Sequence, residues 1–269
     1  MKKWIRLLLM LFFAIIFLFS LWKLLGLLGD YRAGRESYQE LTQYVSFEET
    51  IATVPPTTQE TEEETEPFIP PDLSQWPQVD FEQLAEINED IVGWIYIEDT
   101  KINYPVVQGE DNSFYMNHMF DGKYNSAGCI FMDYRCEGDC SGRNSILYGH
   151  HMKNKSMFAQ LVNYKKQVFY EEHPVALLLT PARYYKIQLF SGYVSNNKGD
   201  AWDVRFTDES YAQWLEDLKK KSCFTSEFAP TEEDRIVTLS TCSYEFSGAK
   251  FVVHGYIAET VELLPPDER

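Results

Sequence analysis

The sequence predicts a mainly β protein: an eight-stranded barrel that follows one helix and has a second, longer helix inserted between its sixth and seventh strands. Eight short runs rich in β-branched and aromatic residues lie between residues 93 and 263, and Gly, Asn, Asp and Pro separate most of them. One amphipathic segment interrupts the series after the sixth run. Short strands at this spacing are typical of a closed or nearly closed barrel.

The eight predicted strands share dense apolar residues and turn-forming residues at their ends. In chain order they are GWIYIEDT, INYPVVQG, AGCIFMDY, NSILYGHH, PVALLLTP, RYYKIQLFSGYVS, RIVTLSTCSY and KFVVHGYIAETVEL.

Both predicted helices begin at a capping residue. In DFEQLAEINEDIVGW, Asp80 is the expected N-cap, and Phe81, Leu84 and Ile87 follow at helical spacing. In TDESYAQWLEDLKKKS, the cap is Thr207 or the next residue, Asp. Acidic residues in its first turn and lysines in its last turn match the helix dipole.

The N-terminal segment predicts a membrane anchor. Residues 7–28, LLLMLFFAIIFLFSLWKLLGLL, are long enough to cross a hydrocarbon core of about 30 Å as a helix. Lys23 interrupts the run, but a lysine near a helix end can extend its ammonium group to the interface. No convincing small-x-small cleavage site follows Ser20, which favours a retained signal anchor over a cleaved signal peptide.

Residues 1–6 predict the orientation of this anchor. They contain three basic residues, which favour a cytoplasmic N-terminus and place everything after residue 30 outside the cell. Arg32 and Arg35 on the far side weaken the asymmetry. We therefore expect a single-pass protein of the cell membrane whose domain after the anchor is extracellular.

The remaining chain divides into a connecting region and one domain. Residues 29–74 connect them: 29–46 predict a short polar helix, and 47–74 a disordered acidic linker with five prolines that holds the domain off the membrane. Residues 75–269 have the ordinary size of one domain. The formal net charge of −17 excludes a phosphate-binding surface of the nucleic-acid type, so we expect no nucleic-acid partner.

Five cysteines could carry chemistry: Cys129, Cys136, Cys140, Cys223 and Cys242. The number is odd, so pairing within the chain cannot use them all. The C-x3-C pair, Cys136 and Cys140, favours a local disulfide or two unpaired surface thiols over zinc, because no second pair lies nearby to complete four ligands. Cys129 and Cys223 lie in apolar or helix-end contexts and are interpreted as packing residues. We therefore predict no metal and no cofactor.

Cys242 has a different context, since it ends the strand RIVTLST, where a side chain can face a cleft. A buried cysteine is often a small apolar residue, but a nucleophilic thiol needs a basic or cationic neighbour and donors for an oxyanion. Both interpretations remain open on this pattern alone.

Five histidines are available as a base. His150 and His151 end the strand NSILYGHH, where Gly149 allows a close approach of the backbone. His254 alternates with apolar residues in FVVHGYI and is expected to face solvent as a strand residue. The other two, in MNHMF and EEHP, are interpreted as structural or solvated residues.

Three motifs together resemble a known family. TLSTC at the end of a strand, YGHHMKNKSMF about 90 residues earlier, and INYPVVQGEDNSFYMNHMFDGKYNSAGCIFMDYR before that are similar to class B sortases over nearly all of residues 76–260. Sortases are cysteine transpeptidases on the outer face of Gram-positive cells. The resemblance implies that the chain cleaves the C-terminal sorting signal of secreted proteins after threonine and transfers the acyl group to a peptidoglycan amine.

The resemblance also implies roles for individual residues. Cys242 matches the nucleophile and His150 the general acid/base, with His151 as its neighbour. Residues expected to bind substrate are Ser240, Thr241, Tyr148, Asn103 and Tyr104. Asp111 and Asn112 lie in segments that often border this cleft, although a turn network explains them equally well.

The third catalytic position departs from the family pattern. The family has arginine in a segment of the form ARFVV, and this chain has AKFVV, with Lys250 in that place. Arginine offers a planar fork of donors, whereas lysine offers one compact, strongly hydrated charge. Loss of an oxyanion donor costs about 10²–10³-fold in rate, so we expect weakened catalysis. The alternatives are a sortase-fold binding protein with little catalysis, a solvent-facing role for Lys250, and a metal or redox module at Cys136 and Cys140.

Overall fold

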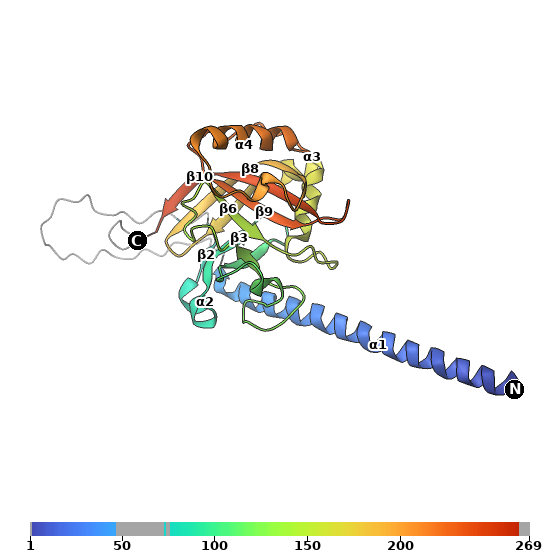
Figure 1. The fold of residues 1–269 in the computed structure, drawn as a ribbon. Helices are drawn as coiled ribbons and strands as arrows, with labels where there is room; N and C mark the ends of the chain where they lie inside the picture. Colours follow the sequence, from blue (N-terminus) through green and yellow to red (C-terminus); the bar gives the residue numbers. More distant parts are fainter. Residues whose placement is uncertain (1, 47–72, 74–75, 264–269) are drawn as a thin grey trace, which may run out of the picture.

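A computed structural model of the chain describes residues 2–46, 73 and 76–263. Its centre is a closed barrel of eight strands in the order β10-β8-β7-β3-β4-β5-β6-β9 (Figure 1). The strands are β3 (Ile91–Tyr96), β4 (Asn103–Val107), β5 (Ile130–Met132), β6 (Asn144–Tyr148), β7 (Val175–Leu179), β8 (Arg183–Asn196), β9 (Ile236–Cys242) and β10 (Ala249–Glu262). Each lies within or overlaps one predicted run, so the predicted mainly β barrel is confirmed.

The pairing of the strands brings distant segments to one end of the barrel. Most neighbours are antiparallel, but β4 pairs with β5 and β6 with β9 in parallel. In these registers Tyr148 lies opposite Ser240, and Lys250 lies opposite Cys242. The ends of β6 and β9 and the start of β10 therefore meet.

The two predicted helices are present. α2 (Phe81–Ile87) begins at Asp80, whose carboxylate accepts a hydrogen bond from the Gln83 amide. α4 (Asp208–Lys221) has Thr207 as its cap and lies between β8 and β9, the sixth and seventh barrel strands, as predicted. It lies along the top of the barrel in Figure 1 and buries the apolar side chains of its inner face, Tyr211, Trp214, Leu215 and Leu218.

Short helical segments lie in the connections between the longer elements. They are η1 (Thr42–Tyr44), η2 (Phe114–Met116), η3 (Phe158–Lys165), α3 (Gln167–Glu172) and η4 (Asp200–Trp202). Of these, η2 and η4 contact the end of the barrel where β6 and β9 finish, through hydrogen bonds described below.

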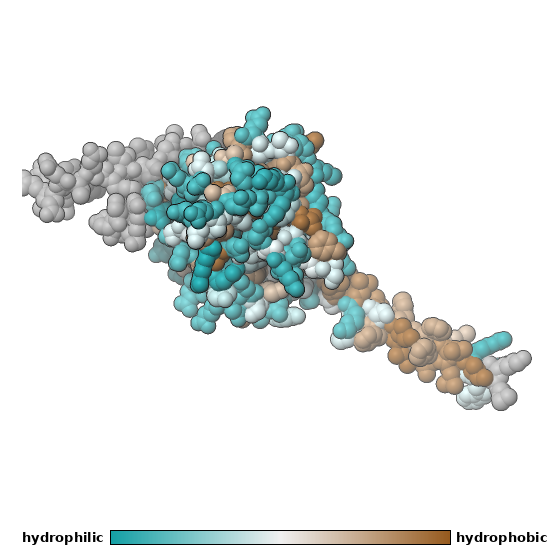
Figure 2. Space-filling model, turned by 45° about the horizontal axis from the view of Figure 1, so that its top comes forward, coloured by the Kyte–Doolittle hydropathy of each residue, from teal (hydrophilic) through white to brown (hydrophobic). Residues whose placement is uncertain are grey.

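The N-terminal helix α1 (Lys2–Leu41) is continuous from the predicted anchor through most of the predicted polar helix. Among the described residues, it alone is long and apolar enough to cross a membrane, as judged by length and composition. It projects from the barrel on the side away from α4, and apolar residues cover the projecting part (Figures 1 and 2).

The last turns of α1 dock onto the barrel. Gly34, Tyr38 and Leu41 are buried at helical spacing. The Tyr38 hydroxyl donates to the Gly128 carbonyl at 2.5 Å, and its ring packs edge to face against Tyr104, with centroids 5.3 Å apart. This docking was not predicted from the sequence, and it fixes the direction of α1 relative to the barrel.

The predicted linker begins and ends on the domain. β1 (Val45–Ser46) pairs with β2 (Gln78–Val79) in a small antiparallel sheet, on either side of the linker. Within 47–74 only residue 73 is described, so the predicted disorder lies outside the described residues. We expected the linker to hold the barrel away from the membrane helix. Instead, the last turns of α1 pack directly against the barrel, so α1 itself connects the apolar segment to the domain.

Candidate active site

Cys242 and Lys250 face each other across two paired strands. Cys242 is the last residue of β9, and Lys250 is the second residue of β10 and its partner in register. The Lys250 ammonium Nζ lies 3.2 Å from Cys242 Sγ. Both residues are half-buried. An ammonium group at this distance is placed to stabilise negative charge that develops at or beside the sulfur.

His150 lies at the same end of the barrel as Cys242 and Lys250, because it follows Gly149, the residue directly after β6. The Gly149 amide donates to the Ser240 carbonyl at 3.1 Å, and Thr241 Oγ1 donates to the Gly149 carbonyl at 2.8 Å. A Cβ at residue 149 would lie 2.7 Å from the Phe158 ring, so only glycine fits without a shift. This close contact of β6 with β9 places His150 and Cys242 in the lining of one cavity.

The His150 ring is oriented by a backbone carbonyl. Its Nε2 lies 2.6 Å from the Met116 carbonyl oxygen, at the end of η2. Because that oxygen only accepts, Nε2 carries a proton. Nδ1 has no hydrogen-bond partner among the described residues, which leaves it free to exchange a proton with a bound substrate.

One cavity of about 230 Å³ collects most of the predicted site residues. The cavity is lined by Asn112, Met116, Phe131, Tyr148, Gly149, His150, Ser240, Thr241, Cys242 and Lys250. The structure therefore brings together Cys242, His150 and Lys250 with three of the five residues expected to bind substrate. Asp111 instead caps a turn, because its carboxylate accepts from the amides of Ser113 and Phe114.

The cavity wall is stabilised by the side chains of three residues, Ser240, Thr241 and Tyr148. Ser240 and Thr241 are 3% and 2% exposed, and the Ser240 hydroxyl accepts from Trp202 Nε1 at 3.1 Å. The Tyr148 hydroxyl donates to the Asp133 carboxylate at 2.9 Å. Their side chains thus connect the cavity wall to η4 and to the loop after β5.

Asp133 is a buried carboxylate that organises this wall. Arg135 binds it through two side-chain hydrogen bonds of 2.9 and 2.8 Å and also donates to the Trp202 carbonyl at 3.1 Å. Burial by itself raises the pKa of Asp133, but the hydrogen bonds from Arg135 and Tyr148 hold it below its usual value. Burial and the adjacent Asp133 raise the pKa of Tyr148, so the phenol remains a hydrogen-bond donor.

Asn103 and Tyr104 lie outside this cavity. Asn103 Oδ1 accepts from Trp94 Nε1 at 2.6 Å, and the Tyr104 hydroxyl accepts from the Met157 amide at 3.0 Å. Both residues line a different cavity, of about 550 Å³, between the barrel and α1. The structure does not bring them together with Cys242.

The remaining histidines differ in their roles. His151 Nδ1 donates to the Cys242 carbonyl at 2.9 Å, so it fixes the backbone at the end of β9. His254 is fully buried and contacts the rings of Tyr193 and Trp214, which contradicts the expectation that it faces solvent. α4 covers that face of β10, so both faces of the strand are buried. Burial lowers the pKa of His254 to about 3.

The other four cysteines are unpaired. Burial raises the pKa of Cys129 and Cys140 to about 12 and that of Cys136 to about 11, so these thiols stay protonated. Cys223 is exposed, so its interpretation as a packing residue is wrong: it follows the end of α4 at the surface. Among the described residues, no group of three or more His, Cys, Asp or Glu side chains is arranged to hold a metal ion.

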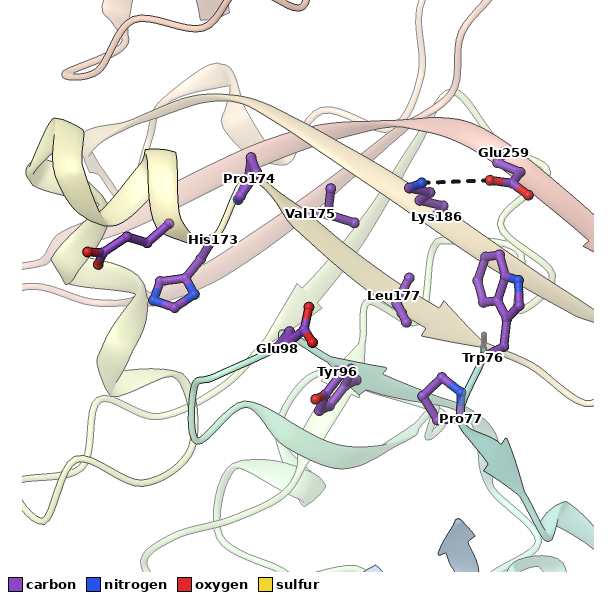
Figure 3. A pocket seen from close by; sticks show the side chains of 11 residues that line it. Trp76, Pro77, Tyr96, Glu98, His173, Pro174, Val175, Leu177, Lys186 and Glu259 are labelled. Carbon is purple, nitrogen blue, oxygen red and sulfur yellow. Dashed lines mark ion pairs between the residues drawn. The ribbon is translucent and has the colours of Figure 1, made fainter. Parts of the chain in front are cut away.

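A third cavity, of about 400 Å³, lies on the barrel wall (Figure 3). Trp76 lies at one end and His173 at the other, and Lys186 pairs with Glu259 at 3.9 Å along its edge. None of the predicted site residues lines it, so it is separate from the cavity that contains Cys242.

Comparison with known proteins identifies the family of this chain. The Sortase domain family matches residues 95–258. The chain belongs to the sortase family.

Its relatives place this sortase in class B. It is 42% identical to sortase B of Staphylococcus aureus over 168 residues, which is 62% of this chain and 69% of that protein. The structure of a Staphylococcus aureus sortase B–substrate complex has a TM-score of 0.63 and 39% identity, covering 68% of this chain and 85% of that one. Bacillus anthracis sortase B in complex with AAEK1 has a TM-score of 0.69 and 32% identity, covering 87% and 99%. The chain is therefore an enzyme of the cysteine transpeptidase type.

Sequence reasoning missed several residues that support the cavity of this sortase. Asp133 and Arg135 lie in the third of the motifs that resemble the family, but nothing in their spacing indicated that Arg135 pairs with a buried carboxylate. Met116 acts through its backbone carbonyl, which no side-chain pattern can reveal. His151 was named from the sequence as the neighbour of His150, but its hydrogen bond to the Cys242 carbonyl was not predicted.

Proposed function

We propose that this class B sortase cleaves a C-terminal sorting signal after threonine and transfers the acyl group to a peptidoglycan amine through a thioester on Cys242. The observation that carries the proposal is the 3.2 Å contact of Lys250 Nζ with Cys242 Sγ, in a cavity that His150 also lines. A nucleophile, a proton carrier and a fixed positive charge are the groups that acyl transfer requires.

In the first half of the reaction, the Cys242 thiolate attacks the threonine carbonyl carbon and forms a carbon–sulfur bond. The resulting oxyanion is stabilised by Lys250 and by backbone amides near Thr241. As the carbon–nitrogen bond breaks, protonated His150 gives its proton to the departing amine. The products are a thioester and the free C-terminal fragment.

In the second half, a peptidoglycan amine attacks the thioester carbonyl carbon. Neutral His150 accepts the proton from the amine, and the carbon–sulfur bond breaks to return the thiolate. His150 is then protonated again, so the cycle closes without a cofactor.

Substrate lies along the wall made by Ser240, Thr241 and Tyr148 in this proposal. Phe131 and Met116 supply apolar surface in the same cavity, and Asn112 supplies an amide. Asn103 and Tyr104 are not part of this groove, because they line the cavity beside α1.

The membrane location is also part of the proposal. α1 anchors the enzyme as a single-pass helix, with basic residues 2, 3 and 6 on the cytoplasmic side and the barrel outside. The partners are then secreted proteins that bear a sorting signal, the peptidoglycan amine and the cell membrane itself.

A second function follows from Lys250. If one ammonium group cannot replace the donors of an arginine, the cavity binds sorting signals with little turnover. The direct contact of Nζ with Sγ favours the catalytic alternative, because it places the charge at the reacting atom.

Transfer of a sorting-signal peptide library to an amine tests the proposal. Cys242→Ala should abolish transfer, while Cys223→Ala, which removes an exposed thiol elsewhere, should leave it unchanged. Full transfer by Cys242→Ala contradicts the proposed nucleophile.

A further inference from the structure

The cavity between α1 and the barrel has an unusual charge for this protein. Its volume is about 550 Å³, and its charged lining residues are two cations, Arg35 from α1 and Lys101 from the loop after β3. Among the described residues, no carboxylate lines it, although the whole chain has a formal charge of −17. A positive cavity in an acidic protein favours an anionic ligand.

Both cations are free to bind such a ligand. Among the described residues, neither the Arg35 nor the Lys101 side chain has an ion-pair or hydrogen-bond partner. By contrast, two nearby basic residues are already paired: Arg32 with Glu36 at 2.7 Å, and Lys123 with Asp121 at 2.7 Å.

The lining adds neutral donors to these charges. Asn154 Oδ1 accepts from the Ser156 hydroxyl at 2.6 Å, and Asn103 Oδ1 accepts from Trp94, so the amide nitrogens of both asparagines are left to donate. Amide N–H groups and a guanidinium together are typical ligands of phosphate oxygens.

The position of the cavity along α1 favours a membrane lipid as the anionic ligand. The apolar run ends at residue 28, so Tyr31, Arg35 and Tyr38 lie about 5, 10 and 15 Å further along the helix at about 1.5 Å per residue. The headgroup layer extends roughly 5–8 Å beyond the hydrocarbon core on each side. The cavity therefore begins at the depth of the headgroups if α1 spans the membrane.

We propose that this cavity binds the phosphate headgroup of an anionic membrane lipid between α1 and the barrel. Arg35 and Lys101 pair with the phosphate, and the amides of Asn103 and Asn154 donate to its oxygens. The inference rests on the proposed membrane anchor and adds a lipid site to it.

One loop, which follows β6, contributes residues to both the lipid site and the catalytic cavity. Gly149 and His150 line the catalytic cavity, whereas Met152, Asn154 and Ser156 from the same loop line the lipid site. The headgroup would thus contact the loop that presents His150, a few residues further along the chain.

Native mass spectrometry of the full-length chain in detergent tests the inference by titration with short-chain phosphatidylglycerol and phosphatidylcholine of equal acyl length. We expect phosphatidylglycerol to bind at least about tenfold more tightly, since each basic residue contributes roughly 1 kcal/mol toward an anionic lipid. The double variant Arg35→Gln/Lys101→Gln should lose about 10- to 30-fold in phosphatidylglycerol affinity by the same reasoning.

The matched control is Arg32→Gln/Lys123→Gln, which removes the same charge from ion-paired surface residues at the same end of the domain. It should change the affinity by less than about twofold. Equal binding of the two lipids, or an equal loss in both double variants, overturns the inference. Displacement of the lipid by inorganic phosphate at equal concentration overturns the lipid assignment, because the site would then bind a soluble anion.

Carbonate extraction of cell membranes tests the anchor separately. A chain that stays in the membrane but binds both lipids equally contradicts the lipid site alone. A chain that carbonate releases contradicts the proposed anchor, while the titration still decides whether the cavity prefers an anionic headgroup.

Discussion

Lys250 Nζ lies 3.2 Å from Cys242 Sγ, across the register that pairs β9 with β10. By the resemblance of AKFVV to the family segment ARFVV, this lysine is expected to stand in an arginine's place, and its charge lies beside the atom that would attack the substrate. The contact requires both strands to remain paired, because neither residue is in a loop.

The charge of Lys250 should be essential for turnover. Lys250→Met keeps the length of the side chain but removes the ammonium group, so kcat/KM for peptide transfer should fall by about 10²–10³. Steady-state transfer assays measure this loss. An unchanged rate would show that the charge stabilises nothing in the reaction.

Lys250→Arg tests how well lysine replaces arginine. The guanidinium offers several donors in a fork, so it can hold an oxyanion and a substrate carbonyl together, and kcat/KM should rise severalfold. Comparison with wild type in the same transfer assay decides between the two functions. A fast wild type that slows with arginine means that the cavity is adapted to lysine, and the binding-protein alternative then fails.

His150 and His151 should differ sharply in their importance. His150→Gln removes the proton carrier, and single-turnover transfer should slow by about 10²–10⁴. His151→Gln removes only the hydrogen bond from Nδ1 to the Cys242 carbonyl, so the loss should be much smaller. Similar losses in the two variants would contradict the assignment of His150 as the acid/base.

His254 should make the domain less stable in acid. Its folded pKa of about 3 is below the ordinary value of 6.5, so below pH 6.5 the unfolded chain binds a proton that the folded chain does not. This residue therefore leaves the free energy of unfolding unchanged above pH 6.5 and lowers it as the pH falls from 6.5 toward 3, by up to about 1.4 kcal/mol per pH unit.

The variant His254→Gln isolates this effect, because glutamine retains hydrogen-bonding groups but does not titrate. Its unfolding free energy, measured by denaturant titration between about pH 4 and pH 7, should depend less steeply on pH than that of wild type. Identical slopes in the two proteins contradict the buried, neutral state of His254.

Tyr38 should stabilise the docking of α1. Tyr38→Phe removes the hydroxyl that donates to the Gly128 carbonyl, and the loss should be about 1 kcal/mol in the free energy of unfolding of the full chain. Tyr124→Phe is the matched control, since that ring is 72% exposed. If both changes have the same effect, the Tyr38 hydrogen bond does not hold the helix.

Local patterns predicted the elements of the fold well. The N-cap of α2 at Asp80 and the place of α4 between the sixth and seventh strands follow from residues near each other in sequence. The parallel pairs β4–β5 and β6–β9 could not be read from such patterns, because they join segments separated by long connections.

Tertiary packing explains two differences from the sequence-based expectations: the burial of His254 and the docking of α1. His254 alternates with apolar residues as a half-exposed strand would, but α4 covers the outer face of β10 and buries it. The docking of α1 was missed because its fully buried residues, Gly34, Tyr38 and Leu41, lie within a polar segment. Their i, i+4, i+7 spacing was the available signal.

The candidate site could be predicted only in part from the sequence. Motifs predicted Cys242, His150 and Lys250 as catalytic residues, and the structure places all three in the lining of one cavity. Asn103 and Tyr104 were assigned from a segment that borders the cleft in the family, but their side chains face the cavity beside α1. Adjacent segments of a strand can line different cavities, and sequence alone does not indicate which.

The most direct test of the central claim is the mass of the trapped acyl-enzyme. The full chain, mixed with a sorting-signal peptide without an amine acceptor and quenched in acid, should yield a Cys242 peptide that carries the substrate fragment ending at threonine. Addition of an amine before the quench should remove this mass. An acyl group on any other residue, or cleavage that continues at the wild-type rate in Cys242→Ala, contradicts the claim that Cys242 is the nucleophile.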